Sequence, residues 1–191
     1  MPHLKAYGLA VLSLVLLAFA GTASATTLTS PAGTAYTGTI KGTSSKITLT
    51  NSSTFGTFQC EHSEIEGTPS SHGSGVTAVA IVGKWTFSKC TGGKPTSPVA
   101  KPGSWEFHLT TAPNATWTSN GSEWVWHETL VGTCIFITKN TDLGTLKGGT
   151  PAKIEIGASP LPQESGNFFC PSSATLGGSY TITSPSTLLV S

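Results

Sequence analysis

The chain has 191 residues and is rich in threonine (31), serine (24) and glycine (22), but it holds only 19 charged side chains and no arginine. This composition excludes a long coiled coil, which needs abundant Glu, Lys, Arg and Ala, and a collagen, which needs strictly periodic glycine. It also lacks the basic excess of a nucleic-acid binder. The class that remains is an exported, weakly charged, β-rich globular protein.

The first 25 residues have the parts of an export signal. Lys5 lies in a short N-terminal region, residues 6–20 are almost wholly apolar, and Ala23-Ser24-Ala25 fits the cleavage rule. The apolar run is shorter than the roughly 20 residues that a spanning helix needs. We therefore expect residues 1–25 to be a signal peptide and residues 26–191 to be one secreted domain, extracellular or associated with the cell surface, with no membrane span after cleavage.

Cleavage would also remove Lys5, which leaves nine lysines against nine acidic side chains. A neutral chain has no surplus of cations for phosphate contacts. We therefore expect no nucleic-acid partner.

Residues 26–191 show strand-type alternation, because Gly, Pro, Ser or Thr interrupts almost every helical window. Ile47 and Leu49, for example, fall on one face of a half-buried strand. The ranges predicted as strands are 34–41, 46–50, 55–66, 75–82, 84–90, 104–111, 116–118, 122–131, 133–139, 152–158 and 179–190. About ten strands at this spacing predict an all-β, single-domain antiparallel β-sandwich or jelly roll.

Two proline-containing stretches, residues 91–103 and 159–173, are predicted as long loops. A short sequence near the start, Thr29-Ser30-Pro31, is repeated near the end as Thr183-Ser184-Pro185. This repeat predicts that the first and last strands lie side by side.

Four cysteines follow the predicted signal peptide: Cys60, Cys90, Cys134 and Cys170. In an exported chain an even number indicates two disulfides, for which three pairings are possible. We favour the pairing of neighbours, Cys60–Cys90 and Cys134–Cys170, which closes one loop in each half. No two cysteines have the C-x-x-C spacing of a zinc site, so no metal is expected there.

The densest aromatic segment is Trp124-Val125-Trp126. Strand alternation places Trp124 and Trp126 on one face and Val125 on the other. An exposed indole pair would stack on sugar rings, whereas a buried pair would fill the core. Trp124 and Trp126 are therefore the candidate ligand-binding residues, with a polysaccharide as the candidate ligand.

No catalytic residue is assigned. Glu106, Glu123 and Glu128, the acids near the tryptophans, lack the close spacing that pairs two carboxylates on one strand face. The run Glu61-His62-Ser63-Glu64 contains the residue types of a Ser/His/acid triad, but adjacent strand residues point to opposite faces. We therefore expect no enzymatic activity.

No metal or cofactor is expected either. The histidines after the predicted signal peptide have no short metal-binding spacing: His62, His72, His108 and His127. Asp142 is the only aspartate, whereas a calcium loop needs several closely spaced oxygen ligands. The segment around Asp142 therefore predicts a turn.

Several motifs resemble a group of small exported Thr/Ser/Gly-rich four-cysteine proteins from Solirubrobacter-type actinobacteria. The matching segments are residues 25–31 with Tyr36-Thr37-Gly38, Cys60, Gly67, residues 71–78, Cys90-Thr91, Gly132-Thr133-Cys134, residues 140–152 and residues 178–185. The resemblance spans most of residues 26–191. It implies an exported protein and carries no established activity or site.

These observations predict a secreted, non-catalytic protein of the cell envelope or extracellular matrix that acts by adhesion or self-association. Neutrality removes mutual repulsion, and abundant Thr, Val and Ile make edge strands available for pairing. The expected partners are a polysaccharide or other copies of the chain. The alternatives are a carbohydrate-binding module that uses Trp124 and Trp126, and a glycan-acting hydrolase.

Overall fold

The computed structural model describes residues 25–31, 33–51, 56–71, 78–92, 103–128 and 132–191. Nearly all of the predicted signal peptide, residues 1–24, lies outside the described residues, as does His72. Of the predicted loop at residues 91–103, the structure describes only residues 91, 92 and 103.

The described residues form thirteen β-strands and no helix. Their bounds are β1 Leu28–Thr29, β2 Ile40–Ser44, β3 Ile47–Asn51, β4 Thr57–Pro69, β5 Ala78–Thr91, β6 Ser104–Leu109, β7 Ala115–Asn120, β8 Glu123–Glu128, β9 Gly132–Ile137, β10 Thr141–Lys147, β11 Lys153–Ser165, β12 Ser173–Ser184 and β13 Leu189–Val190. The all-β class is therefore confirmed.

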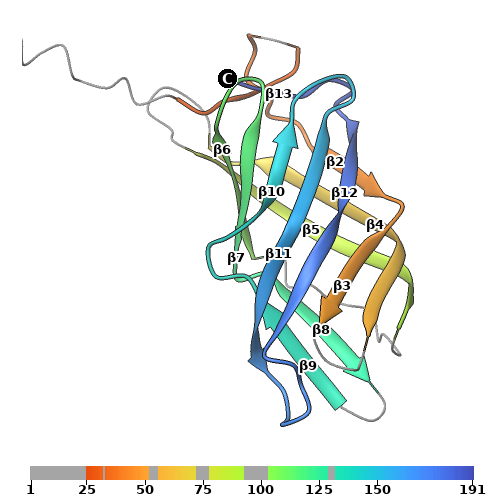
Figure 1. Ribbon diagram of the computed structural model, residues 1–191. Coiled ribbons are helices and arrows are strands. Elements are labelled where there is room, and N and C mark those ends of the chain that lie inside the picture. The colour runs from red at the N-terminus through yellow and green to blue at the C-terminus, as the bar shows by residue number, and fades with distance from the viewer. Residues whose placement is uncertain (1–24, 32, 52–55, 72–77, 93–102, 129–131) are drawn as a thin grey trace, which may run out of the picture.

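The main sheet closes on itself, as Figure 1 shows. Strands β4, β5, β6, β7, β10, β11 and β12 pair in that order, and the short strands β2 and β3 both pair with β12 and with β4. Because β2 and β3 together fill one gap, the ring has eight positions. All pairings are antiparallel. The structure is thus a closed barrel, whereas the strand spacing predicted a sandwich or jelly roll.

Long strands account for this difference. The sequence predicted two strands on either side of Gly83, but β5 continues through it for 14 residues. A Cβ atom at position 83 would contact the carbonyl oxygen of Glu66 on β4, so glycine permits the close strand approach that keeps this pairing continuous. Strands of this length wrap around the barrel axis, since sheet closure requires tilted strands.

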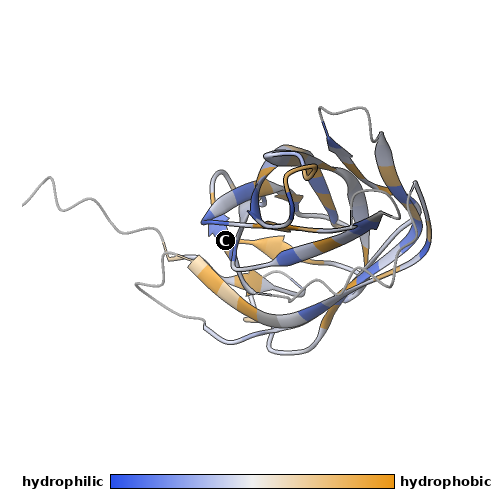
Figure 2. Ribbon diagram, turned by 90° about the horizontal axis from the view of Figure 1, so that it is seen from below, coloured by the Kyte–Doolittle hydropathy of each residue, from blue (hydrophilic) through white to orange (hydrophobic). Residues whose placement is uncertain are grey.

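Alternation along the strands builds one core inside the barrel. In β4, for example, Phe58, Cys60 and Ile65 are buried while neighbouring positions are half-buried or exposed. Hydrophobic and hydrophilic residues alternate along the strands in Figure 2. The same pattern buries Ile47 and Leu49 in β3, as the sequence predicted.

Two smaller pairings complete the fold. β1 and β13 form a two-stranded sheet with Leu28 opposite Val190, which confirms that the first and last strands lie side by side. The β8–β9 hairpin extends the main sheet from the end of β11, where Gln163 pairs with Phe136 and Ser165 with Ile135. The predicted loop at residues 159–173 is therefore wrong for its first part, because β11 continues to Ser165. The turn predicted around Asp142 is also wrong, because Asp142 lies in β10 beside a bulge.

Candidate functional site

Two disulfides join the pairs favoured from the sequence. Cys60–Cys90 links directly opposite residues of β4 and β5. Cys134–Cys170 links β9 to the loop between β11 and β12. No free cysteine remains among the described residues, which hold all four.

The Cys134–Cys170 disulfide holds a short loop, residues 166–172, that projects from the end of the barrel carrying the β8–β9 hairpin (Figure 1). At its base the amide of Gln163 donates to the carbonyl of Ser172 at 2.9 Å. At its tip the side-chain oxygen of Asn167 accepts from the amide of Phe169 at 2.9 Å, and the carbonyl of Asn167 accepts from the amide of Cys170 at 3.0 Å. These bonds form an Asx-type turn that fixes the tip.

The tip exposes two aromatic side chains. Phe168 is 95% exposed and Phe169 is 60% exposed, and their ring centroids lie 5.7 Å apart. They are the exposed large hydrophobic residues of the described chain. Since most large apolar side chains are buried, a fixed pair at a loop tip is a candidate contact surface. We call Phe168 and Phe169 the Phe tip.

The tryptophans predicted as ligand-binding residues lie in the core. Trp124 is 3% exposed and Trp126 is 4% exposed. Trp124 packs edge-on against Trp85 with ring centroids 5.0 Å apart, and Trp126 lies 6.5 Å from the ring of Phe58. Neither indole presents a face to solvent, so the prediction of a sugar-stacking pair at these positions does not fit this structure. The barrel interior needs large rings to fill it, and β8 supplies two of them.

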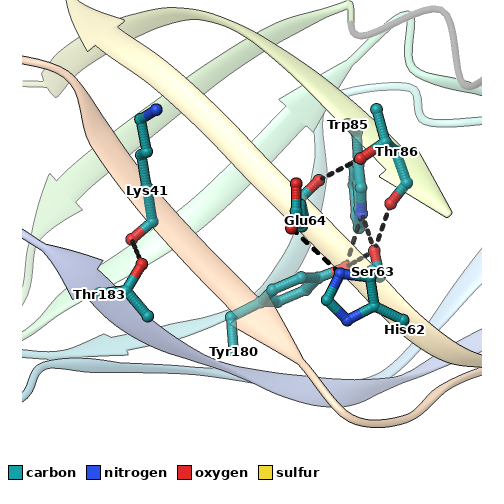
Figure 3. Close-up of polar contacts among 8 residues, drawn as sticks. All are labelled: Lys41, His62, Ser63, Glu64, Trp85, Thr86, Tyr180 and Thr183. Carbon is teal, nitrogen blue, oxygen red and sulfur yellow. Dashed lines mark hydrogen bonds and ion pairs between the residues drawn. The ribbon is translucent and has the colours of Figure 1, made fainter.

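Three polar side chains inside the barrel, those of Ser63, Trp85 and Tyr180, are bonded to one another (Figure 3). The Trp85 indole N–H donates to the hydroxyls of Tyr180 and Ser63, which lie 2.7 Å apart, and the Ser63 hydroxyl donates to the carbonyl of Thr86 at 2.8 Å. Burial raises the pKa of the Tyr180 phenol well above its ordinary value, and its hydrogen bonds with Ser63 and Trp85 oppose that shift only in part. The cluster ties β4, β5 and β12 together.

Strand β4 carries the residue types of a catalytic triad but places them on opposite faces. Ser63 is fully buried, whereas His62 lies on the outer face and its Nε2 contacts Glu64 Oε1 at 3.0 Å. His62 and Ser63 thus point to opposite sides of β4, as alternation predicts. They cannot act together as base and nucleophile.

A polar groove of about 360 Å³ crosses the outer faces of β6 and β7. Its lining residues are Ser104, Glu106, His108, Thr118, Ser119, Asn120 and Asn140. His108 Nε2 lies 3.1 Å from Glu106 Oε2 and 3.0 Å from Thr118 Oγ1. Because one ring nitrogen meets both oxygens, the imidazole does not relay a proton between the acid and the hydroxyl as a triad histidine does. The groove offers hydrogen-bonding groups, and its lining includes no Phe, Tyr or Trp ring.

A second groove of about 290 Å³ crosses the outer faces of β2, β4, β5 and β12 and contains two carboxylates. Glu66 lies 3.7 Å from Lys41 and 3.5 Å from Lys84, and Glu64 contacts His62. Glu64 and Glu66 alternate on one strand, so they share one wall of the groove. Glycoside hydrolysis instead needs two carboxyl groups that flank the scissile bond.

The three histidines in the described part of the chain lie on separate strands. His62 lies on β4, His108 on β6 and His127 on β8. In the described ranges, no group of three His, Cys, Asp or Glu side chains is placed to hold a metal ion.

Comparison with known proteins gives no relative. No family model matches the chain, and neither a curated protein nor a solved structure matches it. The resemblance to exported four-cysteine proteins therefore stays a prediction. The part of the chain that the structure describes contains no apolar helix of the length that a bilayer crossing requires.

The Phe tip was not predicted from the sequence. Its signal is nevertheless present, because Asn167-Phe168-Phe169 lies between Gly166 and Cys170-Pro171 in a segment without alternation. Two adjacent aromatic residues in such a segment have no common core face on which both can be buried.

Proposed function

We propose that this protein is a secreted, non-catalytic protein of the cell envelope or extracellular matrix that acts by adhesion or self-association. The observation that carries the proposal is the Phe tip, with Phe168 95% and Phe169 60% exposed. Two disulfides support a location in an oxidising compartment, where such bonds persist.

The Phe tip suits a contact role because it is both apolar and fixed. Two phenylalanines with these exposures offer roughly 300 Å² of apolar surface. The disulfide at Cys170 and the turn at Asn167 hold that surface in place before any partner arrives. A pre-ordered contact loses less conformational entropy on binding than a flexible one.

Replacing both rings tests the proposal. Purified chain is mixed with intact bacterial cells and sedimented, and its self-association is followed by sedimentation velocity over a range of concentrations. We expect wild type to sediment with the cells or to self-associate, and Phe168→Ser/Phe169→Ser to lose at least one of these behaviours. The matched control, Phe168→Tyr/Phe169→Tyr, keeps the rings and should behave as wild type.

Two outcomes would contradict this proposal. Wild type that neither sediments with cells nor self-associates at any concentration removes adhesion and self-association together. A serine double variant that matches wild type in both assays removes the Phe tip as the contact.

Carbohydrate binding is the second candidate function, and the polar groove over β6 and β7 favours it. Glu106, His108 and Asn120 are the kinds of side chain that bond to sugar hydroxyls, and they line one volume of about 360 Å³. Pull-down with insoluble polysaccharides tests this candidate, with Asn120→Ala as the variant that should lose binding. Equal retention of wild type and variant, or no retention of either, would count against it.

A further inference from the structure

The Phe tip projects from one end of the barrel. All residues from 164 to 169 are exposed, and Cys170, which follows them, is buried. Figure 1 shows this loop at the end of the molecule opposite to the terminal strands β1 and β13. Neither ring lines the two polar grooves described above. Phe168 and Phe169 therefore form a convex apolar surface rather than the wall of a groove.

The loop that carries the Phe tip has no charged side chain. Residues 166–172 are Gly-Asn-Phe-Phe-Cys-Pro-Ser, and the cysteine is held in a disulfide. The carboxylate of Glu164, which precedes the loop, is paired with the ammonium of Lys139 at 3.0 Å. A neutral loop does not attract a partner of opposite charge. Contact through the tip thus depends on its apolar area.

Two backbone amides of the tip already have partners within the loop. The Phe169 amide donates to Asn167 Oδ1 at 2.9 Å, and the Cys170 amide donates to the Asn167 carbonyl at 3.0 Å. An amide that enters an apolar phase without a partner is destabilising, because no water replaces the bond that it loses. These two amides can leave water without that penalty.

The geometry of the rings disfavours a sugar as the ligand of the tip. The planes of Phe168 and Phe169 meet at 76°, and their centroids lie 5.7 Å apart. Stacking on a sugar needs a flat aromatic face, and two rings at this angle form no common platform.

Contact with the tip of a second copy would be too small to hold two barrels together. The Phe tip offers roughly 300 Å² of apolar surface, so two tips that met would bury about 600 Å² in total. Stable protein interfaces bury about 1,200–2,000 Å².

A lipid bilayer accepts a small convex tip without a complementary shape, because lipids rearrange around an inserted side chain. The strength of binding at the bilayer interface scales with the apolar area that is buried. Aromatic side chains are also enriched at this depth in membrane proteins. Because the loop is neutral, insertion does not require anionic lipid.

We propose that the Phe tip inserts into the interface of a lipid bilayer, with Phe168 and Phe169 at the level of the headgroups and the barrel outside. The inference rests on the proposed function, of which it specifies the adhesion. It names the partner as a membrane surface with zwitterionic headgroups. The contact is reversible, since two side chains bury less apolar area than a stable anchor does.

Vesicle flotation with the purified chain tests the inference. We expect wild type to float with phosphatidylcholine vesicles, and to do so equally when phosphatidylglycerol is added or the salt concentration is raised. Phe168→Ser/Phe169→Ser should lower the affinity by about tenfold or more. The matched control, Phe168→Leu/Phe169→Leu, keeps the apolar surface without the rings and should keep most of the binding. Circular dichroism confirms that each variant is folded.

A tryptophan placed at the tip reports insertion directly. Phe168→Trp adds one exposed indole to a chain whose five tryptophans are buried. Its emission should shift to the blue with phosphatidylcholine vesicles and should be quenched by lipids brominated on their acyl chains. Ser186→Trp places an indole on an exposed position between β12 and β13, and should show neither change.

The outcomes separate this inference from the proposed function. Wild type that sediments with cells but floats with no vesicle overturns lipid insertion and leaves adhesion to another partner. Flotation that requires phosphatidylglycerol and is lost at high salt shows electrostatic capture, which overturns the inference. A serine double variant that floats as wild type does, or a response of Ser186→Trp in place of Phe168→Trp, also overturns it. A chain that binds neither cells nor vesicles and does not self-associate removes the proposed function as well.

Discussion

The hydroxyl oxygens of Ser63 and Tyr180 lie 2.7 Å apart inside the barrel, although 117 residues separate them in the chain. Ser63 lies on β4 and Tyr180 on β12, the two strands between which β2 and β3 complete the ring. The Trp85 indole N–H donates to both oxygens, so each of the three polar groups is bonded to the other two. Buried polar groups satisfied in this way favour one arrangement of the strands over others, because any shift leaves a group unpaired.

We expect Tyr180→Phe to lower the free energy of unfolding by about 1–2 kcal/mol, since it removes two buried hydrogen bonds. Ser63 would keep its bonds to Trp85 and to the Thr86 carbonyl, which limits the cost. Urea unfolding followed by circular dichroism measures the change. Tyr36→Phe is the matched control and should cost less, because the Tyr36 hydroxyl makes one local, half-buried bond to the Thr39 carbonyl. An equal loss in the free energy of unfolding for the two variants would contradict a special role for the Ser63–Trp85–Tyr180 cluster.

Alkaline pH should destabilise the fold through Tyr180. Burial raises the pKa of its phenol above the ordinary value near 10. Above pH 10 the unfolded chain loses this proton while the folded chain keeps it, so the free energy of unfolding falls by up to about 1.4 kcal/mol per pH unit. Below pH 10 both states are neutral and the effect disappears. The difference in the free energy of unfolding between wild type and Tyr180→Phe should therefore shrink as pH rises from 10 to 11. Lysine titration affects both proteins alike, so this comparison isolates the phenol.

Tryptophan fluorescence should report five buried indoles. The chain has five tryptophans, and the most exposed of them, Trp105 and Trp126, are only 4% exposed. We expect a blue-shifted emission maximum and almost no quenching by iodide in the folded protein, with ordinary quenching after unfolding in urea. If iodide quenched the folded protein nearly as strongly as free indole, the burial of the tryptophans would be contradicted, and Trp124 and Trp126 would again be candidates for an exposed pair.

Local features of the fold were predictable from the sequence, whereas the closure of the main sheet into a barrel was not. Alternation at Ile47 and Leu49 found a strand because the period of two is a local property. The ring depends on β12 pairing with both β2 and β3, whose residues lie more than 120 positions away, and no local pattern encodes that partner choice. The Trp124–Trp126 segment was correctly placed on a strand, but alternation cannot say whether its aromatic face meets solvent or a core. The answer depends on the strands opposite, which supply Trp85 and Phe58.

Gly166 should be essential for the shape of the Phe tip. It has a φ of 148°, and a Cβ atom at this position would collide with Cys170 Sγ. Gly166→Ala must therefore displace either the loop backbone or the disulfide, and we expect a loss of about 1–3 kcal/mol in the free energy of unfolding. Gly157→Ala, in the preceding strand β11, is the matched control, because a Cβ atom there meets nothing within 4 Å. Urea unfolding measures both variants, and hydrogen exchange at the Phe169 amide, which Asn167 holds, reports the loop directly. Faster exchange at Phe169 in Gly166→Ala alone is the expected result, whereas equal stability and exchange in the two variants would show that the disulfide does not fix the tip.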